Sequence, residues 1–158
     1  MSEVRTWRAE PADAETVARL LCGFRDHLRR SGPSDNAVLA GVERLMEGLD
    51  AEFLLACSDE DSPPSAVCQL RFRFALWEAS PDCWLEDLFV LERARRRGLG
   101  AALVAAALQR AAERGCRRIE LDTAEDNLPA LALYERMGFS TNSKGSARTL
   151  LLGRRVEG

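Results

Sequence analysis

Three arginines and two glycines stand together near the middle of the chain, where an alanine-rich helical pattern begins. The run reads Arg95, Arg96, Arg97, Gly98, Leu99, Gly100 and Ala101. The first turn of a helix has N–H groups without helical partners, and its positive end attracts anions. Guanidinium groups beside it add charged hydrogen-bond donors. We therefore predict an anion site suited to a pyrophosphate, with a solvated basic turn as the ordinary alternative.

Two adjacent carboxylates, Glu86 and Asp87, lie in an apolar run from residue 84 to residue 90, whose composition is typical of a β-strand. Successive side chains of a strand point to opposite faces, so only one of the two can point into a cleft. A carboxylate held in a cleft can act as a general base. The alternative is that both are ordinary carboxylates at the end of a strand.

A second polar group begins at Asn127. Asn127 followed by Pro129 is typical of a helix start, and Gly138 is typical of a helix end. Tyr134, the only tyrosine of the chain, falls inside this helix. Its phenol could donate a proton to a leaving group, or its ring could pack as a core aromatic on an apolar helix face.

His27 is the only histidine. It lies on the first predicted helix, where a lone histidine is more often a surface or packing residue than a functional one. The five cysteines are scattered and contain no C-x-x-C pair. We therefore predict no metal site and no Ser-His-Asp or Cys-His nucleophile. The cysteines are expected to be buried, reduced thiols.

The periodicity of apolar residues predicts the elements that must position these groups. Strands are expected at residues 4–8, 52–57, 68–76, 82–90 and 118–122, and helices at residues 11–31, 36–49, 99–114 and 127–138. A final pair of strands is expected around the polar loop 140–146. One would begin at Phe139, and the other would contain the leucines of residues 150–152.

The order of these elements also predicts how two of the strands pair. Segments 68–76 and 82–90 are expected to form an antiparallel hairpin, and the strand, helix and strand between residues 82 and 122 a parallel crossover unit. Strict alternation in segment 68–76 places Gln69, Arg71 and Arg73 on an exposed face.

Composition indicates a single domain spanning residues 1–158. The chain has 158 residues, of which 46% are apolar, enough for one sizeable core. Its charged beginning carries no secretory pattern and no apolar run approaches the length of a membrane span, so we expect a cytoplasmic protein without membrane association. The net charge of −3 argues against a nucleic-acid partner.

Taken together, the two motifs resemble those of the GNAT superfamily of acyl-CoA N-acyltransferases. The Q/R-x-x-G-x-G/A element of that family is matched by Arg95, Gly98 and Gly100. Its N-x-x-A-x-x-x-Y-x-x-x-G-F element is matched by Asn127, Ala130, Tyr134, Gly138 and Phe139. The resemblance covers residues 85–139, while the N-terminal third agrees in layout only. It implies a mixed α/β fold with a central, mostly antiparallel sheet of six or seven strands, a splayed pair at its middle, and helices on both faces.

The resemblance also implies acetyl-CoA as co-substrate. Its pyrophosphate would lie on the backbone of residues 96–101, and its pantetheine arm along a strand edge opened by a bulge. The residues implied in cofactor binding are Leu88, Phe89, Val90, Arg95, Arg96, Arg97, Gly98, Leu99, Gly100, Ala101, Asn127 and Ala130.

The acidic strand resembles that of the diamine and related small-amine acetyltransferases. By this resemblance we expect Glu86 to be the general base and Tyr134 the general acid for the CoA thiolate. Asp87 would form hydrogen bonds or orient the substrate. His27 is a second substrate-binding candidate, because the first helix borders the acceptor site in this family.

The expected function is therefore transfer of an acetyl group from acetyl-CoA to a primary amine of a small molecule, by direct attack in a ternary complex. Arg25, Arg29 and Arg30 on the first helix would repel a polycation, which leaves the acceptor open. The alternatives are a protein N-terminal or lysine acetyltransferase, and a noncatalytic acyl-CoA-binding module. A homodimer is compatible with all of these.

Overall fold

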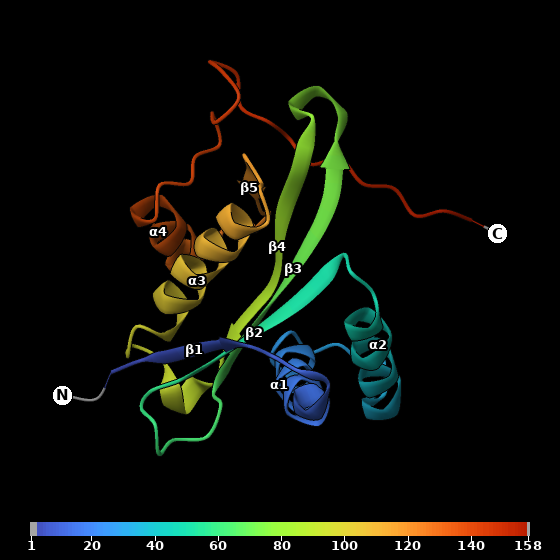
Figure 1. The fold of residues 1–158 in the computed structure, drawn as a ribbon, viewed down its shortest axis with the longest axis vertical. Coiled ribbons are helices and arrows are strands. Elements are labelled where there is room, and N and C mark those ends of the chain that lie inside the picture. Colours follow the sequence, from blue (N-terminus) through green and yellow to red (C-terminus); the bar gives the residue numbers. More distant parts are fainter. Residues whose placement is uncertain (1–2, 158) are drawn as a thin grey trace. The chain divides into compact units, whose positions relative to one another are not determined.

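A computed structural model describes residues 3–157, which divide after Leu121 into two compact units. The first unit contains a five-stranded sheet in the order β1-β2-β3-β4-β5 (Figure 1). The strands are β1 (Arg5–Arg8), β2 (Ala51–Cys57), β3 (Ala66–Ala75), β4 (Ser80–Val90) and β5 (Ile119–Glu120). Its helices are α1 (Ala14–His27), α2 (Asp35–Glu47) and α3 (Leu99–Glu113). The second unit contains α4 (Leu128–Arg136).

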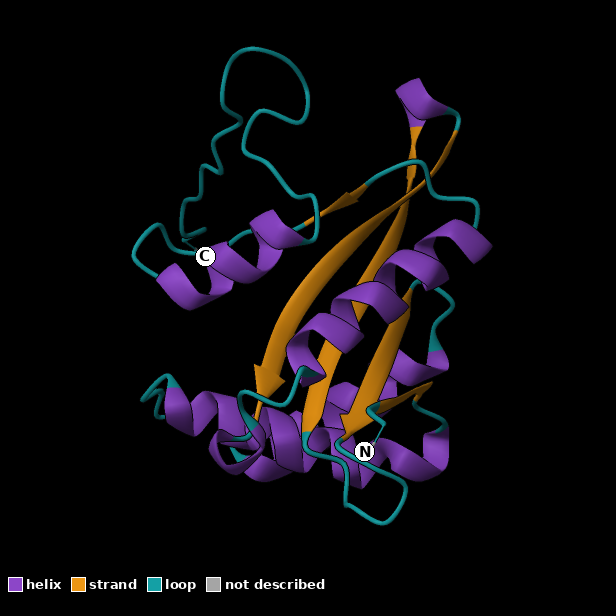
Figure 2. Ribbon diagram, turned by 90° about the vertical axis from the view of Figure 1, so that its left-hand side faces the viewer, coloured by secondary structure: helices purple, strands orange, loops and turns teal. Residues whose placement is uncertain are grey.

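The predicted hairpin and crossover unit are both confirmed. β3 and β4 pair antiparallel, with Leu70 opposite Leu85. The chain then leaves β4 through α3 and returns as β5, which pairs parallel to β4 (Figure 2). The other strand pairs, β1 with β2 and β2 with β3, are antiparallel. The mixed α/β class with a mostly antiparallel sheet is therefore confirmed.

Helices cover both faces of this sheet. Phe53 of β2 belongs to a buried cluster that includes Val17 and Leu20 of α1 and Val42 of α2. The residue before it, Glu52, bonds to Arg110 of α3. Because neighbouring residues of a strand face opposite sides, α3 lies on the face away from α1 and α2.

The sheet has fewer strands than the six or seven predicted. Within residues 3–157 no strand follows β5, so the expected final pair at Phe139 and at residues 150–152 is wrong. The side chains of Leu150, Leu151 and Leu152 are exposed. A short apolar run forms a strand only where it finds a partner for its backbone. Here one backbone bond, from the Thr149 N–H to the Thr141 carbonyl (3.1 Å), spans the polar loop.

The alternation predicted for β3 holds for only part of the strand. Arg71 and Arg73 are exposed as expected, but Gln69 is buried. This half of β3 lies between β2 and β4 and is covered on both faces, which alternation within one strand does not reveal. Towards its other end the hairpin extends beyond α1 and α2 (Figure 1), and Phe74 is exposed there.

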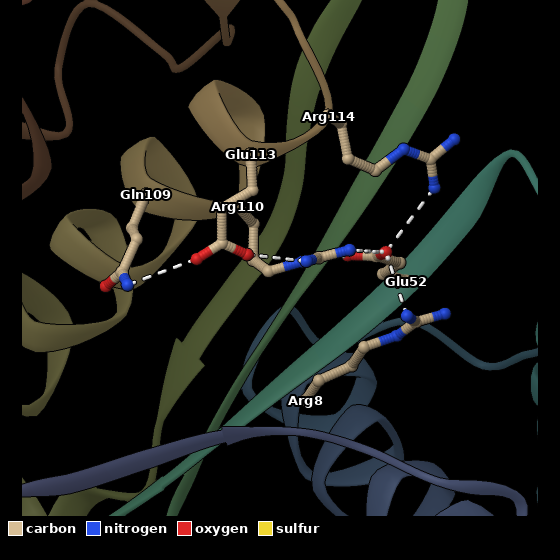
Figure 3. A network of polar contacts seen from close by, with 6 residues as sticks. All are labelled: Arg8, Glu52, Gln109, Arg110, Glu113 and Arg114. Carbon is tan, nitrogen blue, oxygen red and sulfur yellow. Dashed lines mark hydrogen bonds and ion pairs between the residues drawn. The ribbon is translucent and has the colours of Figure 1, made fainter.

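One buried carboxylate, Glu52, joins the sheet to α3. Its side chain has no exposed surface, and Arg110 donates hydrogen bonds to both carboxylate oxygens. Arg8 and Arg114 each approach Oε1 at 3.4 Å (Figure 3). Burial by itself would raise the pKa of Glu52. The hydrogen bonds from Arg110 and Arg114 and the charges of Arg8 and Arg110 outweigh it and hold the pKa of Glu52 below its ordinary value.

Replacing Glu52 by glutamine is expected to lower the free energy of unfolding by about 2–3 kcal/mol at pH 7, because it leaves partly buried arginines without a counter-charge. The lowered pKa of Glu52 means that its contribution is present above the unfolded-state pKa, about 4.3, and is lost as pH falls through the folded-state pKa. The gap between wild type and Glu52→Gln should therefore shrink in acid. Urea unfolding at several pH values measures it.

Glu113→Gln is the matched control. Glu113 also pairs with Arg110, at 2.7 Å, but its side chain is 47% exposed. Loss of such a surface pair should change stability by less than about 1 kcal/mol. Equal effects of the two variants would contradict a special role for the buried carboxylate.

Candidate active site

β4 is interrupted by a bulge immediately after Glu86. Glu86 pairs with Gln69 of β3 and Phe89 pairs with Val67, so two residues of β4, Asp87 and Leu88, oppose one residue of β3. The backbone of Asp87 is in the left-handed region, with φ of 55°. A bulge bends its strand and increases the local twist. The bulge therefore changes the direction of β4 next to Glu86, the predicted general base.

The bulge is accompanied by a separation of β4 from β5. Within the described part of the chain these two strands pair at Cys83 with Ile119 and at Trp84 with Glu120, and not beyond. The residues of β4 after Trp84 thus run along an edge on that side. An unpaired strand edge presents N–H and C=O groups to any extended ligand that lies beside it. β4 and β5 are therefore splayed as expected, but the pair lies at the edge of the five-stranded sheet and not at its middle, because no strand follows β5 in residues 3–157.

The two carboxylates differ in exposure. Glu86 is half-buried and Asp87 is exposed. Glu86 faces the same side of the sheet as its partner Gln69, which is the side of α1 and α2. Asp87 sits in the bulge, where simple alternation no longer describes the direction of the side chain.

The turn before α3 has the conformation of an anion-binding loop. Arg96 and Gly98 both have positive φ, of 64° and 81°, and Gly98 is the N-cap of the helix without any side-chain cap. Turns that contain left-handed residues can direct successive N–H groups into one concavity. The first turn of the 15-residue α3 follows directly. Gly100 and Ala101 lie in this turn and are half-buried.

The arginines of this turn are exposed, and one of them is tied to β4. Arg95 donates from Nε to the carbonyl of Val90 at 3.1 Å, which links the turn to the end of the open strand. Between residues 3 and 157, Arg93, Arg95, Arg96 and Arg97 form no ion pair with a carboxylate. The turn thus has the uncompensated positive charge that an anionic ligand requires.

The end of α1 lies beside the end of β4. The ring of Phe89 is 5.2 Å from that of Phe24 and 6.0 Å from that of His27, measured between centroids. A Cβ at Gly23 would lie 3.3 Å from the Phe89 ring, so the helix approaches the strand closely. His27 is exposed. The structure therefore brings His27, Phe89 and the bulge to one region of the first unit.

The remaining predicted residues, Asn127, Ala130 and Tyr134, belong to the second unit. Asn127 is the N-cap of α4, and its side chain accepts the N–H of Ala130 at 3.4 Å, which confirms the predicted cap. Tyr134 is half-buried, and its ring lies 5.8 Å from that of Phe139. Gly138 follows the helix with φ of 90°, as expected for a helix stop.

The cysteines have the properties of structural thiols. Cys57, Cys68 and Cys83 are buried, while Cys22 and Cys116 are half-buried, and all five are free. Burial raises the pKa of the Cys83 thiol to about 12 and that of Cys68 above its ordinary value. These two thiols are therefore protonated at neutral pH and are poor nucleophiles.

No helix of residues 3–157 combines the length and the apolar character needed to cross a bilayer.

Comparison with known proteins gives a consistent result. Residues 22–139 match the family model described as the acetyltransferase (GNAT) family. The chain is 34% identical over 108 residues to mycothiol acetyltransferase of Corynebacterium aurimucosum, a match that spans 63% of this chain and 36% of that protein. It is 28% identical over 123 residues to an aminoglycoside N(6')-acetyltransferase of Salmonella typhimurium, covering 77% of this chain and 84% of the relative.

A solved structure, that of a provisionally assigned acetyltransferase from Arthrobacter sp. FB24, superposes with a TM-score of 0.84. It is 30% identical to this chain, and the match covers 96% of both chains.

Proposed function

Because the chain belongs to the GNAT family of acetyltransferases, we propose that it transfers an acetyl group from acetyl-CoA to a primary amine of a small molecule. The observation that carries this proposal is the bulge in β4. The bulge directly follows a half-buried carboxylate, Glu86, on the open strand edge that leads to the arginine-glycine turn of α3. A base, a surface for an extended arm and an anion site thus follow one another along 16 residues, from Glu86 to Ala101.

Acetyl-CoA would use this edge and turn in sequence. Its pantetheine amides can pair with the backbone of Leu88, Phe89 and Val90, where β4 has left β5. Its pyrophosphate can accept hydrogen bonds from the backbone N–H groups of residues 96–101 and form ion pairs with Arg96 and Arg97. Asn127 and Ala130 complete the proposed cofactor contacts through the family motif.

Two proton transfers are then needed. The pKa of an alkyl ammonium group, near 10.4, lies about three units above pH 7. Removing its proton at pH 7 therefore costs on the order of 4 kcal/mol. Glu86 is the proposed base for that proton. The departing CoA thiolate must be protonated, and Tyr134 is the proposed acid. Asp87 and His27 are proposed to orient the acceptor.

The charge of α1 is less repulsive to a cationic acceptor than the sequence suggested. Arg25 is paired with Asp26 at 3.0 Å and with Asp35 at 2.8 Å, and its side chain is only 17% exposed. Arg29 and Arg30, which were expected on the first helix, follow its end at His27 and are exposed, so they still repel a polycation. An acceptor with one or a few amines is therefore favoured over a long polycation, which agrees with the small-molecule proposal.

We also propose that residues 1–158 form a single N-acetyltransferase domain, since the family match from residue 22 to residue 139 includes parts of both compact units. A cytoplasmic location and a homodimer stay predictions.

The test is a panel of amines, assayed by release of free CoA thiol from acetyl-CoA. Aminoglycosides, short diamines, amino sugars and a lysine peptide represent the acceptor classes. Thermal shift with CoA and acetyl-CoA is measured in parallel, because a ligand at 100 times its Kd stabilises the fold by about 2.7 kcal/mol. Stabilisation without turnover on any amine would favour the noncatalytic binding module. Turnover on the lysine peptide alone would favour a protein acetyltransferase.

Gly98→Val is expected to weaken acetyl-CoA binding by at least about tenfold. A β-branched residue strongly disfavours the φ of 81° found at Gly98, and a side chain there would also stand between the ligand and the backbone. Apart from its two chain neighbours, no atom of the described residues lies within 4 Å of a Cβ at this position, so the loss would come from the loop and the ligand rather than from a core clash. Calorimetry measures the affinity.

Gly115→Val provides the control for backbone strain. Gly115 follows the other end of α3, has φ of 79° and also has open space around a Cβ. Both variants should lose similar stability, but only Gly98→Val should lose affinity. Unchanged affinity in a folded Gly98→Val protein would place the pyrophosphate elsewhere.

A further inference from the structure

Gln69 of β3 is a polar side chain in the interior of the first unit. Its residue surface is 4% exposed, and among the described residues Nε2 has no hydrogen-bond partner. Buried polar groups are nearly always paired, because an unmade hydrogen bond in the interior is destabilising. A donor that stays unpaired in the protein alone is therefore a sign of a missing acceptor atom, either a water oxygen or a ligand oxygen.

The strand register places this amide beside the proposed base. Gln69 is directly opposite Glu86, and these two residues form the last pair of β3 and β4 before the bulge. Directly opposed residues of antiparallel strands point to the same face, with Cβ atoms about 4.5–5.5 Å apart. Val67, two residues before Gln69, packs with Phe89 in the cluster that α1 and α2 cover. Because residues two apart on a strand share a face, Gln69 and Glu86 also point to the side of α1 and α2.

Arg71 of β3 lies on the same face, two residues from Gln69, and its charged side chain is exposed. Asp87 occupies the bulge, His27 contacts Phe89 from α1, and Cys22 interacts with Asp35 where α1 meets α2. The residues that α1 and α2 direct into the cluster are apolar. The large ionic group around Glu52 lies on the opposite face with α3. The Gln69 amide is therefore the buried uncharged donor next to Glu86.

We propose that Gln69 is a positioning residue for Glu86, and that its Nε2 holds the water through which this carboxylate takes the proton of the acceptor. This rests on the proposed function. The N–H of Gln69 donates to the water oxygen, and the water donates to the Glu86 carboxylate. As the acceptor nitrogen gives its proton to the water, the water gives one of its own to Glu86. One proton thus moves from nitrogen to carboxylate, and the water is regenerated.

Gln69→Leu tests this assignment. It removes the donor at similar volume, so kcat/KM for the acceptor should fall about tenfold, a part of what general base catalysis contributes. Loss of a water that donates to ionised Glu86 also raises the pKa of this carboxyl. The acid limb of the pH profile should therefore move to higher pH. Affinity for acetyl-CoA should stay unchanged, and the Tm should be equal or higher, since a buried amide and its water have been replaced by an apolar group.

Ser80→Ala is the matched control. Ser80 is also buried, and its Oγ likewise lacks a partner within the described residues, but it lies at the far end of the hairpin opposite Ala75. This variant should change neither the rate nor the pH profile. If the Gln69 amide had only a structural role, Gln69→Leu would likewise change neither the rate nor the pH profile.

An unshifted pH profile and a wild-type rate in Gln69→Leu would overturn the proposal while leaving acetyl transfer established by the wild-type enzyme. If Gln69→Leu does not fold, Gln69→Met serves as the second variant, and failure of both to fold would identify the amide as structural. If the wild-type protein transfers no acetyl group to any amine, it is the proposed function that fails. The two failures are thus distinguishable.

Discussion

Glu86→Gln is expected to lower kcat for acetyl transfer by about 10² or more near neutral pH while acetyl-CoA binds as tightly as before. Glutamine keeps the size and hydrogen bonding of the side chain but cannot accept a proton at this pH. The rate should partly recover as pH rises, because the free amine then forms in solution without help from the enzyme. Steady-state thiol release at saturating acetyl-CoA, measured from pH 6 to pH 10, gives both results.

Asp87→Asn is the comparison that locates the base. Asparagine tolerates the left-handed backbone that Asp87 adopts at φ of 55°, so the bulge should survive. We expect a smaller loss than in Glu86→Gln, mainly in KM for the acceptor. An inactive Asp87 variant beside a normal Glu86 variant would move the base by one residue. The bulge makes this a real test, because alternation does not fix the direction of Asp87.

The sequence was a good guide wherever a structural feature depends on local patterns. The helix start at Asn127 and the left-handed glycine after α4 were predicted from residue types known to favour them, and both occur. The parallel crossover through α3 followed from the order of strand, helix and strand. In each case the neighbouring residues in the chain decide the outcome.

Features that depend on contacts between distant segments were not predictable in the same way. A left-handed Asp87 has no strong signal, since aspartate adopts this conformation only in a suitable turn or bulge. The burial of Gln69 depends on two strands and two layers of helices around it. Glu52 did carry a signal, as a lone charge in an otherwise apolar strand, but its three arginine partners come from residues 8, 110 and 114.

The candidate site shows the same division. The order of the arginine-glycine turn and its helix follows from the motif alone, but the bond from Arg95 to the Val90 carbonyl depends on how the loop folds back. The contact between His27 and Phe89 joins residues that are far apart in the sequence. The resemblance implied a bulge and an open strand edge, and the structure locates them after Glu86 and Trp84. The buried amide of Gln69 is the feature that the first unit adds.

Tyr134→Phe is expected to lower kcat with acetyl-CoA by roughly 10 to 10³, within the range of general acid catalysis. The change removes a hydroxyl and keeps the ring that contacts Phe139. It also leaves the Tyr134 carbonyl, which accepts the N–H of Phe139 at 2.9 Å at the end of α4. The fold and the affinity for CoA should therefore survive. A phenol with a pKa near 10 can donate once the sulfur, with a reference thiol pKa near 8.5, has gained charge.

Phe139→Leu separates this chemistry from packing. It breaks the ring contact with Tyr134 but leaves the hydroxyl, so it should lower the Tm with little effect on kcat. Thermal unfolding and steady-state thiol release are measured for both variants at saturating acetyl-CoA, with a pre-steady-state burst test to establish that chemistry limits the rate. If the folded Tyr134→Phe enzyme then turns over at the wild-type rate, water protonates the thiolate. In that event Tyr134 acts through its ring alone, and the two variants should differ only in stability.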